Sequence, residues 1–173
     1  MYRTSPYYLA LATSSVFTFV MYPLAASLTS FYFFELEESS VESLFTWMGI
    51  LMLSAVAGAF WGYAMGTFVE VDSTAIQTNM LSIMIFCYGA GIYVNTGPSA
   101  SIVTKVLSYI SPMRYSSELL MRRILAGKVG GNQVLEAFGF EWGSDFCIMM
   151  LLVWTFLYFI TGWIVLAWKT RKI

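Results

Sequence analysis

Histidine is absent from the 173 residues of this chain, and charged residues make up only 11% of them. A chain without histidine has no bis-histidine haem site, no histidine-ligated zinc or copper and no histidine-based acid–base catalysis. The net charge of -1 provides no basic face of the kind that nucleic acids bind, so we expect no nucleic-acid partner.

Motifs for metal and nucleotide binding are also missing. The two cysteines, Cys87 and Cys147, lie in or beside apolar runs without CxxC spacing, so we expect two small buried residues and no metal site. No G-x-x-x-x-G-K-[ST] motif is present, so the usual backbone cradle for ATP is lacking. The apolar runs also lack paired carboxylates and an activated nucleophile, which argues against a membrane enzyme.

Long apolar runs dominate what is present. Hydrophobic residues make up 58% of the chain, and its mean hydropathy is +0.70. A helix needs about 20 apolar residues to cross the hydrocarbon core of a bilayer. Four runs meet this length, at about residues 8–34, 44–68, 74–94 and 146–168. The sequence therefore predicts an all-α fold, a polytopic membrane helical bundle with four spanning helices. The first run lacks a cleavage site, so we expect it to span the membrane rather than act as a signal peptide.

The segment at about residues 99–125 is apolar but is split by Ser111-Pro112 into two pieces that are too short to cross. Such pieces are typical of a re-entrant helical hairpin, here placed before the last spanning helix. Within it we single out Pro112, Arg114, Tyr115 and Glu118. A charge at membrane depth needs a partner, and Glu118 lies one helical turn after Arg114, which predicts a structural clasp between them.

Four small residues recur at four-residue spacing in the second run, namely Ser54, Gly58, Gly62 and Gly66. Small residues at this spacing allow a neighbouring helix to approach closely, so we interpret them as a helix-packing face. The spacing alone leaves open whether the neighbour belongs to this chain or to a second subunit.

The third run carries Gln77, Asn79 and Ser82, which are polar side chains at membrane depth. Amides in hydrocarbon need partners, so we expect these residues to face the bundle or a wet cavity. Basic residues lie near both termini and also between the third and fourth runs, so charge alone leaves the orientation undecided. We favour both termini in the cytosol, because the positive-inside rule is weaker in a long, partly re-entrant loop.

The order of these features resembles one transporter family. The chain starts with Tyr2-Arg-Thr-Ser-Pro-Tyr-Tyr-Leu9, ends its third run with Gly91-Ile-Tyr-Val-Asn95, and continues with Tyr109-Ile-Ser-Pro-Met-Arg-Tyr115 and a basic C-terminus. This pattern resembles the G (White/Scarlet) subfamily of ABC transporters over essentially the whole chain. The likeness corresponds to the last four of six membrane helices, and it implies either a fragment of a longer protein or a separate subunit.

The resemblance implies half of an export pathway for lipophilic molecules such as a lipid, a sterol or a xenobiotic. The pathway would lie at a homo- or heterodimer interface in the plasma membrane or an endomembrane, with ATP and Mg bound by a nucleotide-binding domain outside this chain. It places Met80, Met84 and Gln77 at the substrate cavity. It also places Ile92 and Tyr93 at an external gate, although Tyr93 departs from the usual aliphatic pair. Ordinary helix packing is the alternative for the methionines and the gate pair.

A second hypothesis needs no transport. The chain is then a four-helix membrane scaffold or assembly protein whose glycine face binds partner helices, and no re-entrant hairpin is required. The arrangement of the segment between the third and fourth runs therefore bears directly on the choice between the two hypotheses.

Overall fold

The computed structural model describes residues 4–33, 41–69, 72–91, 93–94, 96–97 and 100–170, and within these residues the chain is entirely helical. The helices are α1 (Thr4–Phe33), α2 (Val41–Phe68), α3 (Asp72–Gly89), α4 (Ile102–Ile110), α5 (Pro112–Leu125), α6 (Gly131–Ala137) and α7 (Ser144–Thr170). The predicted all-α membrane bundle is confirmed.

Three helices are long and apolar enough to cross a bilayer. Their candidate spans are Pro6–Ser30 in α1, Glu42–Phe68 in α2 and Ser144–Thr170 in α7. Many large apolar side chains on these helices, such as Phe17 and Phe156, are exposed. Exposing such surface to water would cost about 25 cal/mol per Å² of apolar area, whereas hydrocarbon accepts it. These helices correspond to the first, second and fourth predicted crossings.

The helix at the third predicted crossing, α3, is shorter than expected. It ends at Gly89 rather than near residue 94, and its 18 residues extend about 27 Å at 1.5 Å per residue. A side chain at Gly89 would lie 2.6 Å from the backbone oxygen of Leu107, so the backbone of α4 occupies the space beside the helix end. Gly91 follows with φ of 83°, a left-handed conformation that favours glycine. A complete crossing by this segment stays a prediction.

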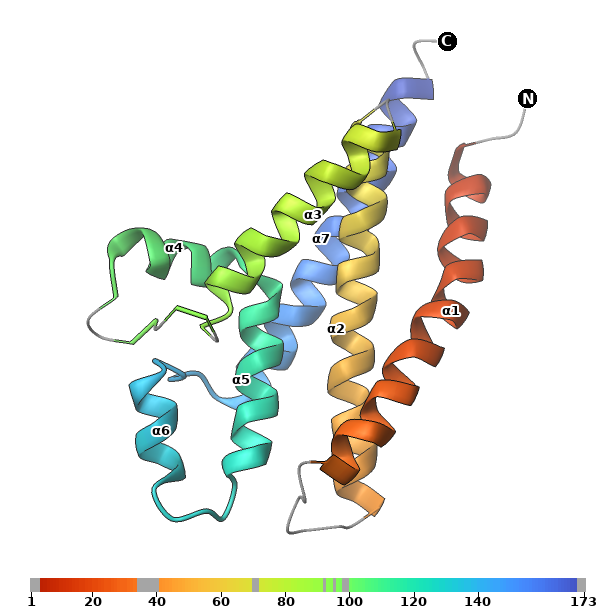
Figure 1. The fold of residues 1–173 in the computed structure, drawn as a ribbon. Coiled ribbons are helices and arrows are strands. Elements are labelled where there is room, and N and C mark those ends of the chain that lie inside the picture. The colour runs from red at the N-terminus through yellow and green to blue at the C-terminus, as the bar shows by residue number, and fades with distance from the viewer. Residues whose placement is uncertain are drawn as a thin grey trace.

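The helices are arranged around α2 (Figure 1). Helices α1 and α7 both pack against α2. The start of α1 and the end of α7 lie at the same end of the bundle (Figure 1). Helix α3 runs along the half of the bundle next to this end, and α5 lies along the other half, against α2 and α7 (Figure 1). Helices α4 and α6 lie on the side of α3 and α5 that is away from α2 (Figure 1).

The best-packed core lies where α2, α5 and α7 meet. Ile50, Tyr115, Leu119, Cys147 and Leu151 form one buried cluster there. Of the two cysteines predicted to be buried, Cys147 is fully buried, whereas Cys87 on α3 is only partly buried. The short helix α5 is therefore an integral part of the bundle.

Helix α1 packs mainly against α2, and a contact near its start also joins it to α7. The Tyr8 hydroxyl donates a hydrogen bond to the backbone oxygen of Phe159, 3.3 Å away, and the two rings lie 5.4 Å apart. Gly162 leaves room for the Tyr8 ring, because a side chain there would lie 3.2 Å from the Tyr8 Cζ atom. This contact joins the start of α1 to the middle of α7.

Candidate functional site

Helices α4 and α5 form a hairpin that turns at Ser111. The Ser111 hydroxyl donates a 2.7 Å hydrogen bond to the backbone oxygen of Phe86, which attaches the turn to α3. Pro112 occupies the first turn of α5, where its missing N–H costs no helical hydrogen bond. The two short helices therefore occur on either side of the predicted break. Entry of this hairpin into the lipid stays a prediction.

The first half of α5 is buried in the bundle rather than free in solvent. Seven of its residues are buried, namely Pro112, Arg114, Tyr115, Ser116, Ser117, Glu118 and Leu119. The helix packs against α7, α2 and α3. Two of these buried residues are charged, so their partners determine how the hairpin is held.

Arg114 connects α5 to two distant loops. Its side chain is only 2% exposed, and its two terminal nitrogens donate hydrogen bonds to the Thr96 hydroxyl and to the backbone oxygen of Gly139. The guanidinium carbon also lies 4.4 Å from the centre of the Phe140 ring, within cation–π range. The Arg114 side chain thus links the segment after α3 to the segment before α7.

Glu118 is fully buried and is held mainly by Arg122. The Arg122 Nη2 atom lies 2.8 Å from the Glu118 Oε1 atom, and the same nitrogen donates to the backbone oxygen of Phe140 at 3.0 Å. The expected partner, Arg114, is more distant, with 4.0 Å between its Nε atom and Glu118 Oε2. The sequence analysis missed Arg122, although its i, i+4 spacing from Glu118 was a usable signal.

We call Arg114, Glu118 and Arg122, together with their partners Thr96, Gly139 and Phe140, the arginine clasp. Burial raises the pKa of Glu118, and Arg122 and then Arg114 offset only part of this effect. Burial likewise lowers the pKa of Arg114. Arg114 and Arg122 donate to the backbone of the segment before α7, and Glu118 pairs with Arg122. A structural role for these charges stays a prediction.

Tyr115 reinforces the same region. Its hydroxyl donates a 2.8 Å hydrogen bond to the backbone oxygen of Tyr109, across the hairpin. Its ring stacks on Trp142 with 5.2 Å between ring centres and 21° between planes. All four hairpin residues singled out in the sequence therefore lie in one packed unit.

The predicted cavity residues of α3 lie elsewhere, on a single outward face. Met80 and Met84 are 62% and 64% exposed, and Gln77 is exposed one turn before Met80. Of the predicted gate pair, Tyr93 is exposed, whereas Ile92 lies outside the described residues. The structure does not bring this open α3 face into contact with the arginine clasp.

The small residues of α2 are not covered by a closely packed helix within the described residues. Gly58 and Gly66 are exposed, and a side chain built at either would meet nothing within 4 Å. At Gly62 the nearest atom would be Nδ2 of Asn79, at 3.9 Å. Close packing of another helix on this face therefore stays a prediction.

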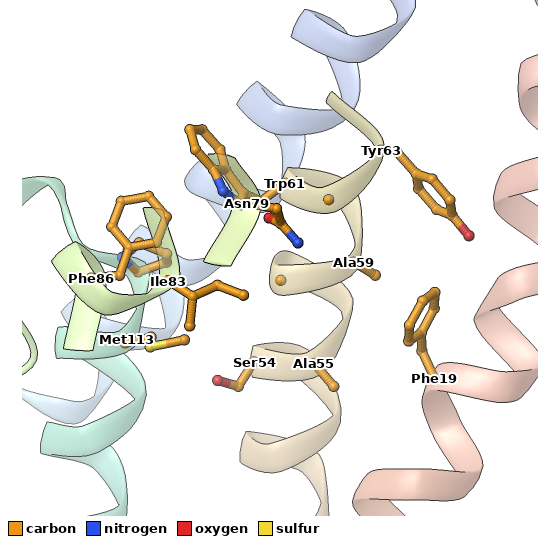
Figure 2. Close-up of a pocket in the computed structure, with 13 residues that line it drawn as sticks. Phe19, Ser54, Ala55, Ala59, Trp61, Tyr63, Asn79, Ile83, Phe86 and Met113 are labelled. Atoms are coloured by element: carbon orange, nitrogen blue, oxygen red, sulfur yellow. The ribbon is translucent and has the colours of Figure 1, made fainter. Parts of the chain in front are cut away.

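This face of α2 instead borders a cavity of about 450 Å³ (Figure 2). Helices α1, α2, α3 and the start of α5 all contribute to its lining. The lining residues are Phe19, Ser54, Ala55, Gly58, Ala59, Trp61, Gly62, Tyr63, Asn79, Ile83, Phe86, Pro112 and Met113. None of them is charged, and most are apolar or aromatic.

Two polar atoms in this lining are buried and have no hydrogen-bond partner among the described residues, namely Trp61 Nε1 and Asn79 Oδ1. The Trp61 ring is fixed edge-on between Phe86 and Tyr158, with ring centres 5.1 Å and 4.9 Å away. Asn79 was singled out in the sequence as a residue facing the bundle or a cavity. Trp61 was not, because only the fold shows that its N–H is isolated.

Comparison with known proteins identifies one family. The family model for the ABC-2 type transporter matches residues 1–125, which include the whole of α1 to α5. No curated protein sequence matches the chain.

Proposed function

The chain belongs to the ABC-2 type transporter family, and on this premise we propose that it forms half of an export pathway for lipophilic molecules at a dimer interface. It is a transmembrane domain of an ABC transporter and an integral multi-pass membrane protein. Such a membrane domain has no ATPase site of its own, and ATP is bound by a separate nucleotide-binding domain. The cargo, the dimer and the G (White/Scarlet) subfamily are parts of the proposal.

The observation that supports this proposal is the exposed face of α3. Met80 and Met84 are flexible, polarisable side chains that suit varied apolar ligands. Gln77 lies on the same exposed face, and an amide in contact with lipid tails would lack hydrogen-bond partners. A face that combines methionine with an amide is better suited to a pathway between subunits than to bulk lipid.

The proposal places both termini in the cytosol, and the arrangement of the helices is compatible with this. The start of α1 and the end of α7 lie at one end of the bundle, and α5 lies toward the other (Figure 1). With both termini in the cytosol, the α4–α5 hairpin belongs to the external half of the membrane. Tyr93 is then placed where an external gate would close above the pathway, and Ile92 would complete the gate.

Transport by the chain together with its nucleotide-binding partner tests the proposal. We expect ATP-dependent extrusion of a fluorescent lipophile from vesicles, and we expect Met84→Trp to reduce it severalfold by narrowing the pathway. The matched control is Leu152→Trp, which adds the same bulk to an exposed position of α7. Equal extrusion by both variants, or failure to co-purify with any ATPase domain, would contradict the proposal.

One observation favours a second candidate function, a membrane scaffold without transport. Gly58 and Gly66 are exposed and leave space for a partner helix to approach. In that case Gly58→Leu would abolish assembly with a partner, and no ATP-dependent extrusion would occur with any nucleotide-binding domain. Transport that persists in the wild-type complex excludes this candidate.

A further inference from the structure

We propose that the cavity between α1, α2, α3 and the start of α5 binds a neutral lipophilic molecule that carries a hydroxyl group. Asn79 and Ile83 line this site from the side of α3 that faces α2 (Figure 2). Met80 and Met84 are exposed and do not line it. Binding there requires neither a second subunit nor ATP, so the inference stands apart from the proposed transport function.

The size and lining of the cavity indicate the class of ligand. Its volume of about 450 Å³ falls within the range of roughly 300–1,000 Å³ that is typical of small-molecule pockets. Phe19, Ile83, Phe86 and Met113 supply apolar contact surface. With no charged residue in the lining, an ionised head group would lose its hydration without gaining a counter-charge. The ligand is therefore neutral and largely apolar.

The two unpaired polar atoms of the lining indicate which functional group the ligand carries. Trp61 Nε1 can only donate a hydrogen bond, and Asn79 Oδ1 can only accept one. Leaving a buried donor or acceptor unpaired is unfavourable, so a ligand that pairs with these atoms is favoured. A hydroxyl group both accepts and donates, so it matches the donor and the acceptor that are left unpaired here. An ether or a carboxylate accepts only, and a carboxylate also adds a charge.

The other polar side chain of α3 close to this region does not compete for the role. The hydroxyl of Ser82 donates to the backbone oxygen of Thr78 at 2.7 Å, within its own helix. Thr78 likewise bonds Thr74 at 2.8 Å. Asn79 is thus the α3 side chain in this stretch whose acceptor is left for a ligand.

Photolabelling of the full chain in phosphatidylcholine vesicles tests the site. The probe is a diazirine-bearing hexadecanol, and its methyl ether and the corresponding carboxylic acid are the comparison probes. We expect the alcohol to label peptides of α2 and α3 severalfold more than either comparison probe, in a manner that unlabelled hexadecanol competes away. Asn79→Leu and Trp61→Phe should reduce alcohol labelling to the level of the ether. Thr78→Val, a shape-matched loss of a neighbouring hydroxyl, should leave it unchanged.

A second variant tests occupancy of the cavity without changing Trp61 or Asn79. Gly58→Leu places a large side chain into the cavity lining at a position where an added Cβ meets nothing, so the fold should persist while labelling by the alcohol is lost. Equal labelling by alcohol and ether would overturn the inference, since it would mean that Trp61 and Asn79 bond each other or stay unpaired.

Repeating the labelling with the nucleotide-binding partner and ATP separates two sources of the same ligand chemistry. Alcohol labelling that disappears on ATP turnover identifies a transported molecule, and labelling that persists identifies a resident membrane lipid. Both results require the binding site to exist. A chain that does not transport can still show labelling that persists, so failure of the transport proposal does not remove the binding site.

Discussion

Replacing Arg114 with methionine should loosen the hairpin more than any comparable change at an exposed arginine. Methionine fills similar space but removes the hydrogen bonds to Thr96 and Gly139 and the contact with Phe140. The two loops would then lose their shared partner. Glu118 would keep Arg122 at 2.8 Å, so its carboxylate would not be left unpaired.

The size of the effect follows from these contacts. Hydrogen bonds to a charged group contribute about 1.5–3 kcal/mol each, and a cation–π contact about 0.5–2 kcal/mol. Release of a buried guanidinium from its desolvation cost offsets a large part of this sum. Breaking a buried ion pair typically costs 3–5 kcal/mol, and the retained Arg122 pair favours the lower end, so we expect about 3 kcal/mol. Arg114→Lys should cost roughly half as much, because one ammonium cannot reproduce the guanidinium fork.

The assay is unfolding in mixed detergent micelles, followed by tryptophan fluorescence. Trp142, one of the six tryptophans, lies 5.4 Å from the guanidinium carbon and stacks on Tyr115, so the total emission follows unfolding of the bundle with the clasp included. Arg123→Met is the control, because Arg123 is exposed on the same helix and its loss should change stability by less than about 0.5 kcal/mol. Equal unfolding midpoints for the two variants would refute the assignment of Arg114 as the link between the loops.

Three further predictions concern the same hairpin and its attachment. Burial raises the pKa of the Glu118 carboxyl group. The stability that this group contributes is therefore fully present below its ordinary pKa and is lost as the pH rises through the raised pKa. We expect Glu118→Gln to flatten the pH dependence of thermal stability between these two pKa values. Gly89→Ala should destabilise the fold by at least about 1–3 kcal/mol, since its methyl group would meet the Leu107 backbone, whereas Gly49→Ala should be tolerated in the same unfolding assay. Ser111→Ala should cost about 1 kcal/mol through loss of its 2.7 Å bond to the α3 backbone, and hydrogen exchange should rise at the end of α3.

The sequence predicts most of the architecture because apolar length and helix breakers are local signals. The three long helices and the break at Ser111-Pro112 can be read from composition and from proline alone. The early end of α3 could not be read, since apolar residues continue beyond Gly89. The helix ends where the backbone of α4 lies against Gly89 and where Gly91 takes a left-handed conformation.

The candidate site, like the fold, could be predicted from the sequence only where its signals are local. The i, i+4 spacing of Arg114, Glu118 and Arg122 is local, and the buried charged triad was within reach of sequence reasoning. Thr96 and Gly139 were not, because they lie 18 and 25 residues from Arg114 and carry no pattern of their own. The isolation of the Trp61 N–H likewise depends on which rings surround it, and only the folded chain determines that.

The arginine clasp also constrains the order in which the chain matures during synthesis. Arg114 emerges from the ribosome well before Gly139 and Phe140, the loop positions that complete its surroundings. Until that later stretch has been made, the guanidinium has no settled place in the nascent bundle, and the hairpin cannot be locked against α7. Packing of α5 against α7 is therefore a late event in biogenesis, and a truncation before residue 139 should leave a chain that quality-control proteases degrade quickly.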